Sequence, residues 1–229
     1  MPIDIYADGA TLENMEELEK NPLIKGYTFN PTLLKKMGVT DFIGFAKNVV
    51  SLTKKPVSFE TFADDWDGMV REGNILAGIG ENVFVKIPIT NSEGIKTTGI
   101  VKDLLKNDVK INYTAIFTYS QIDDAIETLG NNNSIISIFA GRICDTGRDP
   151  KTFIGYASYN KLPLQQILWA SSRGLWNIKE AEDSGADIIT VGYDILKKMS
   201  LWGKDLTQFS LETVRMFRQD ALDSGFEIK

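Results

Sequence analysis

Short apolar runs alternate with amphipathic segments along the whole chain. Each run is bounded by turn residues, which predicts a buried strand, and each segment between two runs carries apolar residues at helical spacing, which predicts a helix. Strands are predicted at residues 3–7, 24–29, 56–59, 82–90, 109–113, 134–140, 164–170 and 187–191. Helices are predicted at residues 11–20, 33–36, 42–52, 64–78, 95–105, 121–129, 151–159, 175–184, 195–199 and 206–222.

Strand and helix follow each other in eight successive units. This alternation indicates a parallel sheet, and eight units in 229 residues predict a (β/α)8 TIM barrel with an additional C-terminal helix. An open doubly wound sheet is the alternative, although no glycine-rich nucleotide fingerprint follows the first strand. Since no proline- or serine-rich linker divides the chain, we expect residues 1–229 to form a single domain.

Composition narrows the class of protein. Hydrophobic residues make up 43% of the chain and charged residues 24%, as in soluble globular proteins, and the net charge of −6 argues against non-specific binding to nucleic acid or anionic membranes. No apolar stretch approaches the length of about 18 residues that a membrane-spanning helix needs, and Met1–Asp4 lacks the basic segment of a signal peptide. We therefore expect a cytoplasmic protein without nucleic-acid or membrane partners.

The chain contains no histidine and a single cysteine, Cys144. The absence of histidine removes the Ser-His-Asp triad, the Cys-His pair and the usual zinc motifs, so proton transfers would fall to carboxylates, tyrosine, lysine or water. Cys144 has no second cysteine for metal binding or for an internal disulfide, and we expect it to be a buried thiol of the core. No metal site is predicted.

Polar residues stand where most of the predicted strands end. In a barrel these positions meet at one rim, where active sites lie. Any one of them is as well explained as a cap or turn residue, but together they bring a lysine, carboxylates, hydroxyls and guanidinium groups to one mouth. They are Asp8, Asn30, Glu60, Lys86, Thr114, Arg142, Ser171 and Arg173.

Lys86 is out of place in the apolar run Val83–Ile89, because lysine is rarely buried without a partner. In one interpretation its amine reaches solvent from the strand end or pairs with a carboxylate of the core. In the other, an uncharged amine condenses with a ketone to give an iminium, which is an electron sink for breaking the adjacent carbon–carbon bond. Carboxylates would then move protons, and arginine with serine would bind a phosphate.

The chain resembles the transaldolase family, in particular its short subfamily, which also includes the fructose-6-phosphate aldolase type. The resemblance runs essentially from end to end and rests on six blocks, each at a predicted strand end. The blocks are Tyr6-Ala-Asp8, Thr28-Phe-Asn-Pro-Thr32, Val85-Lys-Ile-Pro-Ile-Thr90, Asn112-Tyr-Thr114, Phe139-Ala-Gly-Arg142 and Ala170-Ser-Ser-Arg173.

The resemblance implies a class I aldolase-type barrel that needs neither metal nor organic cofactor. It implies that Lys86 forms the Schiff base, that Asp8 takes the proton from the substrate C4 hydroxyl, and that Glu60 and Thr114 orient a catalytic water. The residues implied to bind substrate comprise a set for the dihydroxyacetone hydroxyls, a set for the phosphate, and two further contacts. These are Asn30, Asn112 and Ser137; Arg142, Ser171 and Arg173; and Thr28 with Phe139.

Two positions distinguish the branches of the family. The aldolase type carries Gln in place of Glu60 and Tyr in place of Phe139, so both residues favour a transaldolase, which moves a dihydroxyacetone unit from a ketose phosphate such as fructose 6-phosphate or sedoheptulose 7-phosphate to an aldose phosphate. Phe29 and Ser172 depart from the family pattern, where a second Thr and an aromatic residue are common, so a modified sugar is an alternative substrate. A lyase that releases dihydroxyacetone and a catalytically inactive sugar-phosphate-binding barrel are further alternatives.

The segment 206–222 is amphipathic, with Phe209, Met216 and Phe217 predicted to be exposed. It could pack on its own barrel or on a neighbouring subunit. The resemblance implies a homo-oligomer, with a decamer of pentameric rings as one form.

Overall fold

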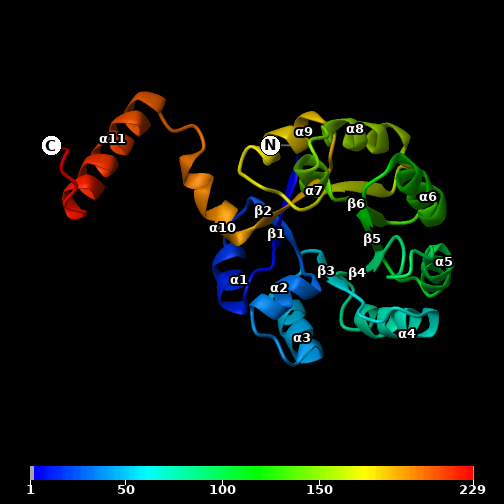
Figure 1. The fold of residues 1–229 in the computed structure, drawn as a ribbon. Helices are drawn as coiled ribbons and strands as arrows, with labels where there is room; N and C mark the ends of the chain where they lie inside the picture. Colours follow the sequence, from blue (N-terminus) through cyan, green and yellow to red (C-terminus); the bar gives the residue numbers. More distant parts are fainter. Residues whose placement is uncertain (1–2, 229) are drawn as a thin grey trace. The chain divides into compact units, whose positions relative to one another are not determined.

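The eight strands form a closed barrel in which every neighbouring pair is parallel and the spatial order is the chain order (Figure 1). The computed structural model describes residues 3–228; Met1 and Pro2, part of the segment Met1–Asp4 on which the expectation about a signal peptide rests, and Lys229 lie outside this range. The strands are β1 (Asp4–Asp8), β2 (Ile24–Thr28), β3 (Val57–Glu60), β4 (Val83–Pro88), β5 (Ile111–Ile116), β6 (Ser134–Ile138), β7 (Gln165–Trp169) and β8 (Ile188–Gly192).

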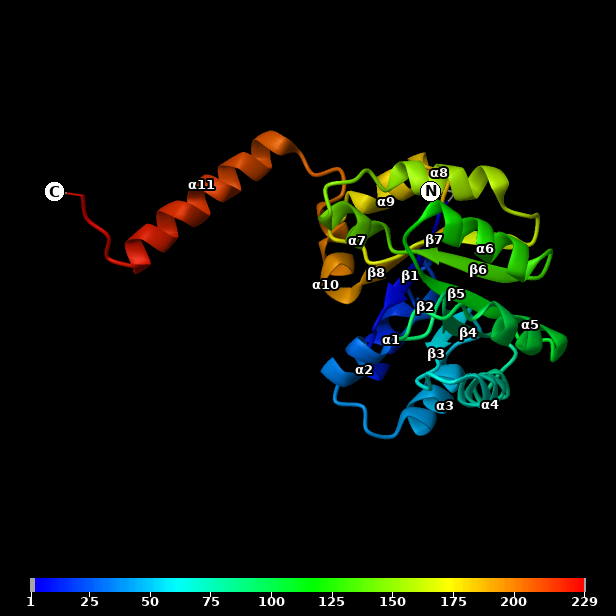
Figure 2. The same ribbon diagram turned by 45° about the vertical axis from the view of Figure 1, so that its right-hand side comes forward.

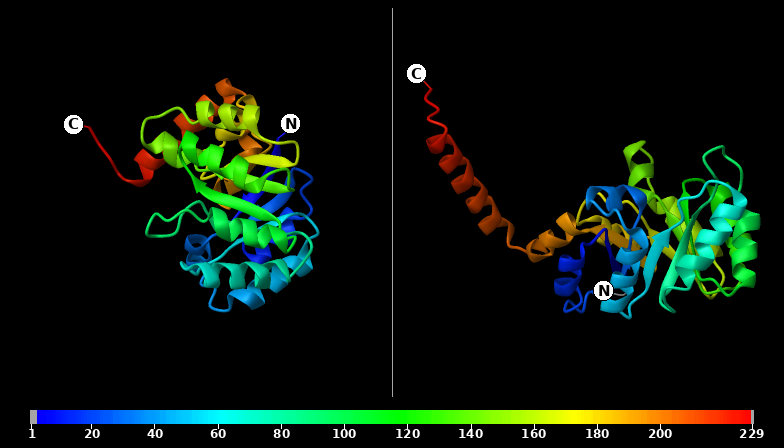
Figure 3. Two further views of the ribbon diagram at one scale, coloured as in Figure 1. Left: turned by 90° about the vertical axis from the view of Figure 1, so that its right-hand side faces the viewer. Right: turned by 90° about the horizontal axis from the view of Figure 1, so that it is seen from below.

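The helices follow the strands in turn, and Figure 2 shows α4, α5 and α6 on the outside of the strands. Figure 3 shows the barrel from two further sides. The helices are α1 (Leu12–Leu18), α2 (Pro31–Lys36), α3 (Phe42–Leu52), α4 (Trp66–Ala77), α5 (Thr98–Lys106), α6 (Tyr119–Leu129), α7 (Ala140–Asp145), α8 (Lys151–Asn160), α9 (Asn177–Asp183), α10 (Tyr193–Leu196) and α11 (Leu206–Asp223), with a 3-10 helix, η1, at Lys197–Leu201.

The predicted (β/α)8 barrel with an additional C-terminal helix is confirmed, and the open doubly wound sheet is excluded. Local signals set many of the helix starts. The side chains of Thr11, Asp41 and Thr118 each accept a hydrogen bond from the backbone N–H three residues later, which satisfies one of the free donors of the first helical turn.

Several predicted boundaries are wrong; the fifth strand, for example, is predicted at residues 109–113 and runs from Ile111 to Ile116. The helix predicted from Ile95 begins only at Thr98, because Thr90 and Lys96 pair as an antiparallel bridge that closes a small turn. The strand predicted to reach Ala140 ends at Ile138, because helix α7 begins at Ala140. The helix predicted at residues 195–199 is divided between α10 and the 3-10 helix η1.

The barrel interior is filled by a layer of large side chains that forms the floor beneath the strand ends. One buried cluster contains Tyr6, Phe84, Ile135, Leu168, Ala170 and Ile188. Gly26 of β2 makes room for this layer, because a Cβ at that position would lie 2.6 Å from the Tyr6 ring. Side chains alternate along each strand, so the polar residues two positions beyond these apolar ones point into the same interior at the upper end.

The chain divides into two compact units, one up to Leu196 and one from Lys197 onward. The expectation of a single domain over residues 1–229 stays a prediction. In the second unit, Asp205 caps α11 by accepting from the Gln208 N–H, and none of the α11 residues is buried. Phe209, Met216 and Phe217 are exposed, as predicted. Over residues 3–228 no helix combines the length and apolar character needed to cross a membrane.

Candidate active site

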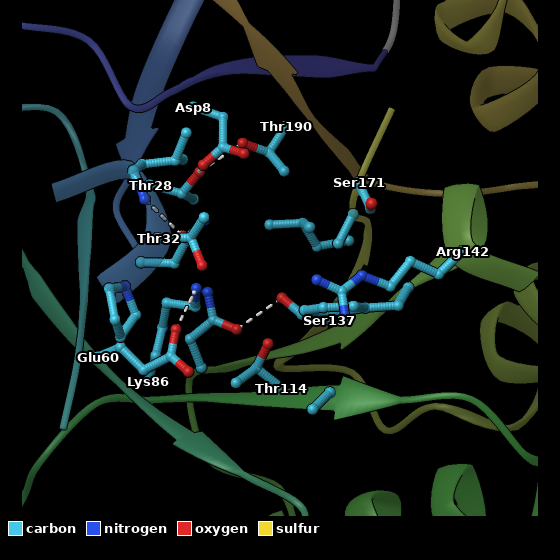
Figure 4. A pocket seen from close by; sticks show the side chains of 18 residues that line it. Asp8, Thr28, Thr32, Glu60, Lys86, Thr114, Ser137, Arg142, Ser171 and Thr190 are labelled. Atoms are coloured by element: carbon cyan, nitrogen blue, oxygen red, sulfur yellow. Dashed lines mark hydrogen bonds and ion pairs between the residues drawn. The ribbon is translucent and has the colours of Figure 1, made fainter. Parts of the chain in front are cut away.

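A cavity of about 410 Å³ opens at the carboxyl ends of the barrel strands (Figure 4). It collects eleven of the twelve residues predicted for the site, from seven different strands or the segments directly after them. These are Asp8, Thr28, Asn30, Glu60, Lys86, Asn112, Thr114, Ser137, Phe139, Arg142 and Ser171. Arg173 does not line the cavity. Thr32 and Thr190, which sequence reasoning did not select, do line it.

Lys86 lies on the interior face of β4 and is only 6% exposed. Its Nζ donates to Glu60 Oε2 at 2.9 Å and to the Phe29 backbone carbonyl at 3.2 Å. The β3–β4 register sets Glu60 directly opposite Lys86, so the ion pair follows from the pairing of the two strands. Lys86 thus pairs with a carboxylate, as one interpretation of the sequence predicted, and its amine also faces the cavity.

Asp8 ends β1 and faces the same cavity. Burial in the barrel mouth raises the pKa of Asp8, while the positive charge of Lys86 and a hydrogen bond from Thr28 act in the opposite direction. The Thr28 hydroxyl donates to Asp8 Oδ1 at 2.8 Å and also contacts the Thr190 hydroxyl. A carboxyl group with a raised pKa inside a cavity is suited to exchanging protons.

Asn112 is held by two serines at the centre of the barrel. Its Nδ2 donates to Ser58 Oγ at 3.0 Å, and its Oδ1 accepts from Ser137 Oγ at 2.6 Å. These contacts fix the orientation of the amide, which leaves one N–H of Asn112 and the lone pairs of Ser137 for a ligand. Ser58 is fully buried and was missed by the sequence reasoning; its spacing of two residues from Glu60 on one strand was the available signal.

Thr114 lies within an irregular stretch of β5. The β5–β6 register shifts between Tyr113 and Ile116, and Ala115 has a φ of 58°, in the left-handed region that L-residues rarely adopt. Thr114 is 1% exposed, and its Oγ1 has no hydrogen-bond partner among residues 3–228 although it lines the cavity. An unsatisfied buried hydroxyl is costly, so this oxygen is a natural contact for a bound water or substrate hydroxyl.

Asn30 has a local structural task as well as a place in the cavity. It caps α2, because its Oδ1 accepts from the Leu33 N–H at 3.0 Å and Pro31 occupies the first helical position. The cap interpretation is thus correct. It also leaves the amide N–H groups of Asn30 as the donors available to a ligand.

Arg142 approaches the cavity from helix α7 and not from a strand end, because β6 already ends at Ile138 and α7 begins at Ala140. Its guanidinium lies over the Phe139 ring at 5.3 Å, and Figure 4 shows the side chain reaching toward the cavity from the side away from Thr28. Helix α7 packs closely on the segment after β7: a Cβ at Gly141 would lie 1.7 Å from the Ser171 carbonyl oxygen. Ser171 itself has a φ of 64°.

Arg173 is turned to a carboxylate instead of the cavity. Its Nε donates to Asp145 Oδ1 at 3.2 Å and its Nη2 donates to Asp145 Oδ2, so the two groups form a forked ion pair. Both side chains are about half exposed, at 48% and 54%. The hydrogen bonds from Arg173, and the charges of Arg173 and Arg142, lower the pKa of Asp145.

Three residues singled out in the sequence lie outside the cavity. Cys144, expected in the core, is exposed, because α7 turns that side chain away from the barrel. Phe29 is buried against Phe45 and Phe59. The Ser172 hydroxyl donates to the Thr190 carbonyl at 3.0 Å. Neither of the two departures from the family pattern lines the cavity.

The cavity thus combines an amine, two carboxylates, several neutral hydroxyl and amide groups and one guanidinium. This set can add an amine to a carbonyl, move protons and bind a polyhydroxylated anion. Within residues 3–228 no three carboxylate or thiol side chains are placed to hold a metal ion.

Comparisons of the sequence with known proteins point in one direction. The family model described as "Transaldolase/Fructose-6-phosphate aldolase" matches residues 5–228. A "Probable transaldolase" of Methanococcus vannielii is 34% identical over 212 residues, which cover 90% of this chain and 93% of that protein. A "Probable transaldolase" of a Thermoanaerobacter species is 32% identical over 226 residues, covering 97% and 99% of the two chains.

Solved structures match the fold at low sequence identity. The 3-hexulose-6-phosphate synthase from Salmonella typhimurium aligns with a TM-score of 0.56 and 14% identity, over 84% of this chain and 89% of that one. The orotidine 5'-monophosphate decarboxylase from Metallosphaera sedula aligns with a TM-score of 0.54 and 16% identity, over 94% and 97%. At this identity the match concerns the barrel fold alone.

Proposed function

The chain belongs to the transaldolase/fructose-6-phosphate aldolase family, and from that premise we propose that it transfers a dihydroxyacetone unit from a ketose phosphate to an aldose phosphate through a Schiff base on Lys86. The observation that carries the proposal is the Lys86 amine, which is nearly buried and points into a polar cavity between Glu60 and Asp8. A nearly buried amine that faces a polar cavity is placed to add to the carbonyl of a bound substrate.

In the proposed reaction, Glu60 accepts the proton that Lys86 must lose, as their 2.9 Å contact allows. The free amine adds to the C2 carbonyl of the ketose, and loss of water gives an iminium. Asp8 then takes the proton of the C4 hydroxyl while the C3–C4 bond breaks, so the aldose leaves and the electron pair is held as an enamine. Addition of the enamine to the acceptor aldehyde returns the proton from Asp8, and water, oriented by Glu60 and Thr114, hydrolyses the new iminium.

The amide and hydroxyl groups of the cavity suit the dihydroxyacetone unit. The Ser137 hydroxyl donates its proton to Asn112 Oδ1, so the Ser137 oxygen is left to accept a hydrogen bond from a substrate hydroxyl. The free N–H of Asn112 can donate to the oxygen of the same hydroxyl. Asn30 offers further donors, because its oxygen is engaged by the N–H of Leu33. The Thr28 side chain borders Asp8 and acts on the substrate mainly through that carboxyl group.

We assign the phosphate to Arg142 and Ser171, which line the cavity, with Arg173 as a third ligand. Arg173 must first exchange Asp145 for the phosphate. This exchange is feasible because both members of the pair are about half exposed, and exposed ion pairs contribute only ~0–1 kcal/mol.

Phe139 favours transfer over release of free dihydroxyacetone. It lines the cavity beside Arg142 and offers no hydroxyl to a water that would protonate or hydrolyse the enamine adduct. The proposed enamine should therefore wait for an acceptor. The same anion-binding groups would accept a sulfonated or otherwise modified sugar, which is the alternative substrate.

Borohydride trapping tests the proposal. With fructose 6-phosphate the protein should gain a reduced three-carbon adduct on the peptide that contains Lys86, and Lys86→Met should remove it. Modification of another lysine, or labelling of the Lys86→Met protein, would overturn the mechanism.

The acceptor dependence separates transferase from lyase. Erythrose 4-phosphate should raise glyceraldehyde 3-phosphate release by at least about tenfold, or about 1.4 kcal/mol of barrier. Phe139→Tyr should shift the balance toward cleavage. If the unmodified protein releases free dihydroxyacetone as fast without acceptor as with it, the aldolase alternative is correct.

The proposal extends to the whole chain: one class I aldolase-type domain over residues 1–229, active in the cytoplasm as a homo-oligomer such as a decamer of pentameric rings. The apolar side chains of α11, among them Phe209, Met216 and Phe217, are exposed and suit a contact with a neighbouring subunit, which supports the oligomer. Sedimentation of the full chain at several concentrations measures this directly, and a monomer at all of them would contradict it.

A further inference from the structure

Thr190 of β8 lines the cavity, although the sequence pattern gives no sign that it is a site residue. It stands inside an apolar strand and is 5% exposed. The β1–β8 register pairs Thr190 with Tyr6, which lies two residues before Asp8 on β1. Residues two apart on a strand face the same side, so the Thr190 side chain reaches the same interior as Asp8 from the neighbouring strand.

The Thr190 hydroxyl is the end of a chain of two hydrogen bonds that leads to Asp8. Thr28 has one proton and donates it to Asp8 Oδ1 at 2.8 Å. Its oxygen is also in hydrogen-bond contact with Thr190 Oγ1, and since the Thr28 proton is committed to the carboxylate, Thr190 is the donor in that contact. The direction is therefore Thr190 to Thr28 to Asp8. Figure 4 shows the three side chains next to one another at the cavity.

Such a chain has two effects. A hydroxyl that accepts a hydrogen bond becomes a stronger donor, so Thr190 strengthens the bond from Thr28 to the carboxylate. It also fixes the Thr28 rotamer, and with it the oxygen of Asp8 that is occupied. Within residues 3–228 the other oxygen, Oδ2, accepts no hydrogen bond, and it is the one left to take a proton from a ligand.

We propose that Thr190 is a positioning residue of the aldol cleavage, which acts through Thr28 to hold the Asp8 carboxylate ionised and with Oδ2 free for the substrate hydroxyl. The inference rests on the proposed role of Asp8 in the transfer reaction. It adds a residue from β8, the one strand whose end carries no predicted site residue.

The charged groups around Asp8 also change its pKa, in addition to the hydrogen bond from Thr28. Burial raises the pKa of Asp8; Lys86 from β4 lowers it, and Glu60 from β3 raises it. Arg142 lies across the same cavity. In the described residues the Thr190 hydroxyl makes its hydrogen bond to Thr28 and to none of these charged groups, so its removal acts on the hydroxyl chain.

Thr190→Val tests the inference, because it keeps the shape and removes the hydroxyl. Without its donor, Thr28 stabilises the carboxylate less, so the acidic limb of the pH profile of kcat/KM should move to higher pH. We expect kcat to fall by about tenfold with KM changed less than about twofold, since the lost bond supports the transition state rather than binding. Thr190→Ser should restore both the profile and kcat.

Thr97→Val is the matched control. It also removes a buried hydroxyl, one that contacts the Tyr113 hydroxyl at 3.0 Å outside the cavity. A purely structural role for Thr190 predicts that both valine variants lose melting temperature and that neither shifts the pH profile. That result overturns the inference. Thr190→Ala gives the same readings should the valine variant fail to fold.

Asp8→Asn, measured in the same assay, separates the inference about Thr190 from the proposed role of Asp8. Loss of activity in Asp8→Asn together with an unshifted profile in Thr190→Val overturns the inference alone. Full activity in Asp8→Asn overturns the proposed role of Asp8 and, with it, the role of Thr190.

Discussion

Replacing Gly141 by alanine should damage anion binding more than any other single-methyl change in the barrel. Gly141 is the second residue of α7, and an added Cβ would lie 1.7 Å from the Ser171 carbonyl oxygen and 2.7 Å from its carbon. Real Cβ contacts essentially never fall below 3.0 Å, so helix and loop must separate by about 1.3 Å. The neighbouring atoms are backbone, which no rotamer change can move away.

The two segments in contact, helix α7 and the loop after β7, carry the proposed phosphate ligands. Arg142 follows Gly141 on the helix, and Ser171 is already held at a φ of 64° on the loop. Overpacking of this kind costs about 1–3 kcal/mol, which for a chain of this length lowers the melting temperature by roughly 2–12 °C. A displacement of about 1 Å in substrate-binding groups can reduce the rate up to about 100-fold.

We therefore expect Gly141→Ala to raise KM for fructose 6-phosphate by about tenfold or more, while turnover of unphosphorylated acceptors changes little. Gly174→Ala is the matched control: it adds the same methyl on the loop after β7, has nothing within 4 Å and needs no left-handed backbone. The assays are steady-state kinetics with both substrate classes and thermal unfolding. If the two alanine variants share one melting temperature and one KM, the close helix–loop contact does not position the anion site.

Two further outcomes follow from the charges of the site. Asp145→Asn releases Arg173 from its ion pair, so KM for phosphorylated substrates should fall by up to about fivefold, with no change for unphosphorylated ones; a rise in KM would show that Asp145 supports the site instead of competing with the phosphate. Burial raises the pKa of Asp8 above its ordinary value of 3.8. At pH values between 3.8 and the raised pKa, the folded protein keeps a proton on Asp8 that the unfolded chain has lost. The free energy of unfolding therefore falls as the pH rises through this range. Asp8→Asn lacks this effect and should exceed the unmodified protein in melting temperature by more at about pH 7 than at about pH 4; an equal difference at both would contradict the raised pKa.

Local sequence predicted the strands well because each is a short buried run between turn residues, and a parallel strand buried on both faces has few other ways to satisfy its side chains. The errors fall where a short-range pattern has two solutions. Ile95 and Lys96 fit helical spacing, but the Thr90–Lys96 bridge takes them into a turn. Ala140 and Gly141 fit a strand end, but they begin α7, which lies close to the Ser171 backbone.

The sequence by itself determined the barrel, the rim at which its polar residues meet and the lysine at its centre, because strand order and alternation place Asp8, Glu60 and Lys86 on one interior face whatever the details of packing. Only the tertiary structure decided which partners those residues have. Ser58 and Thr190 are ordinary strand residues by pattern and become neighbours of Asn112 and Thr28 only through contacts across the closed barrel. Hydrogen bonds between residues far apart in the chain depend on register and rotamer, which no local pattern of apolar and polar positions encodes.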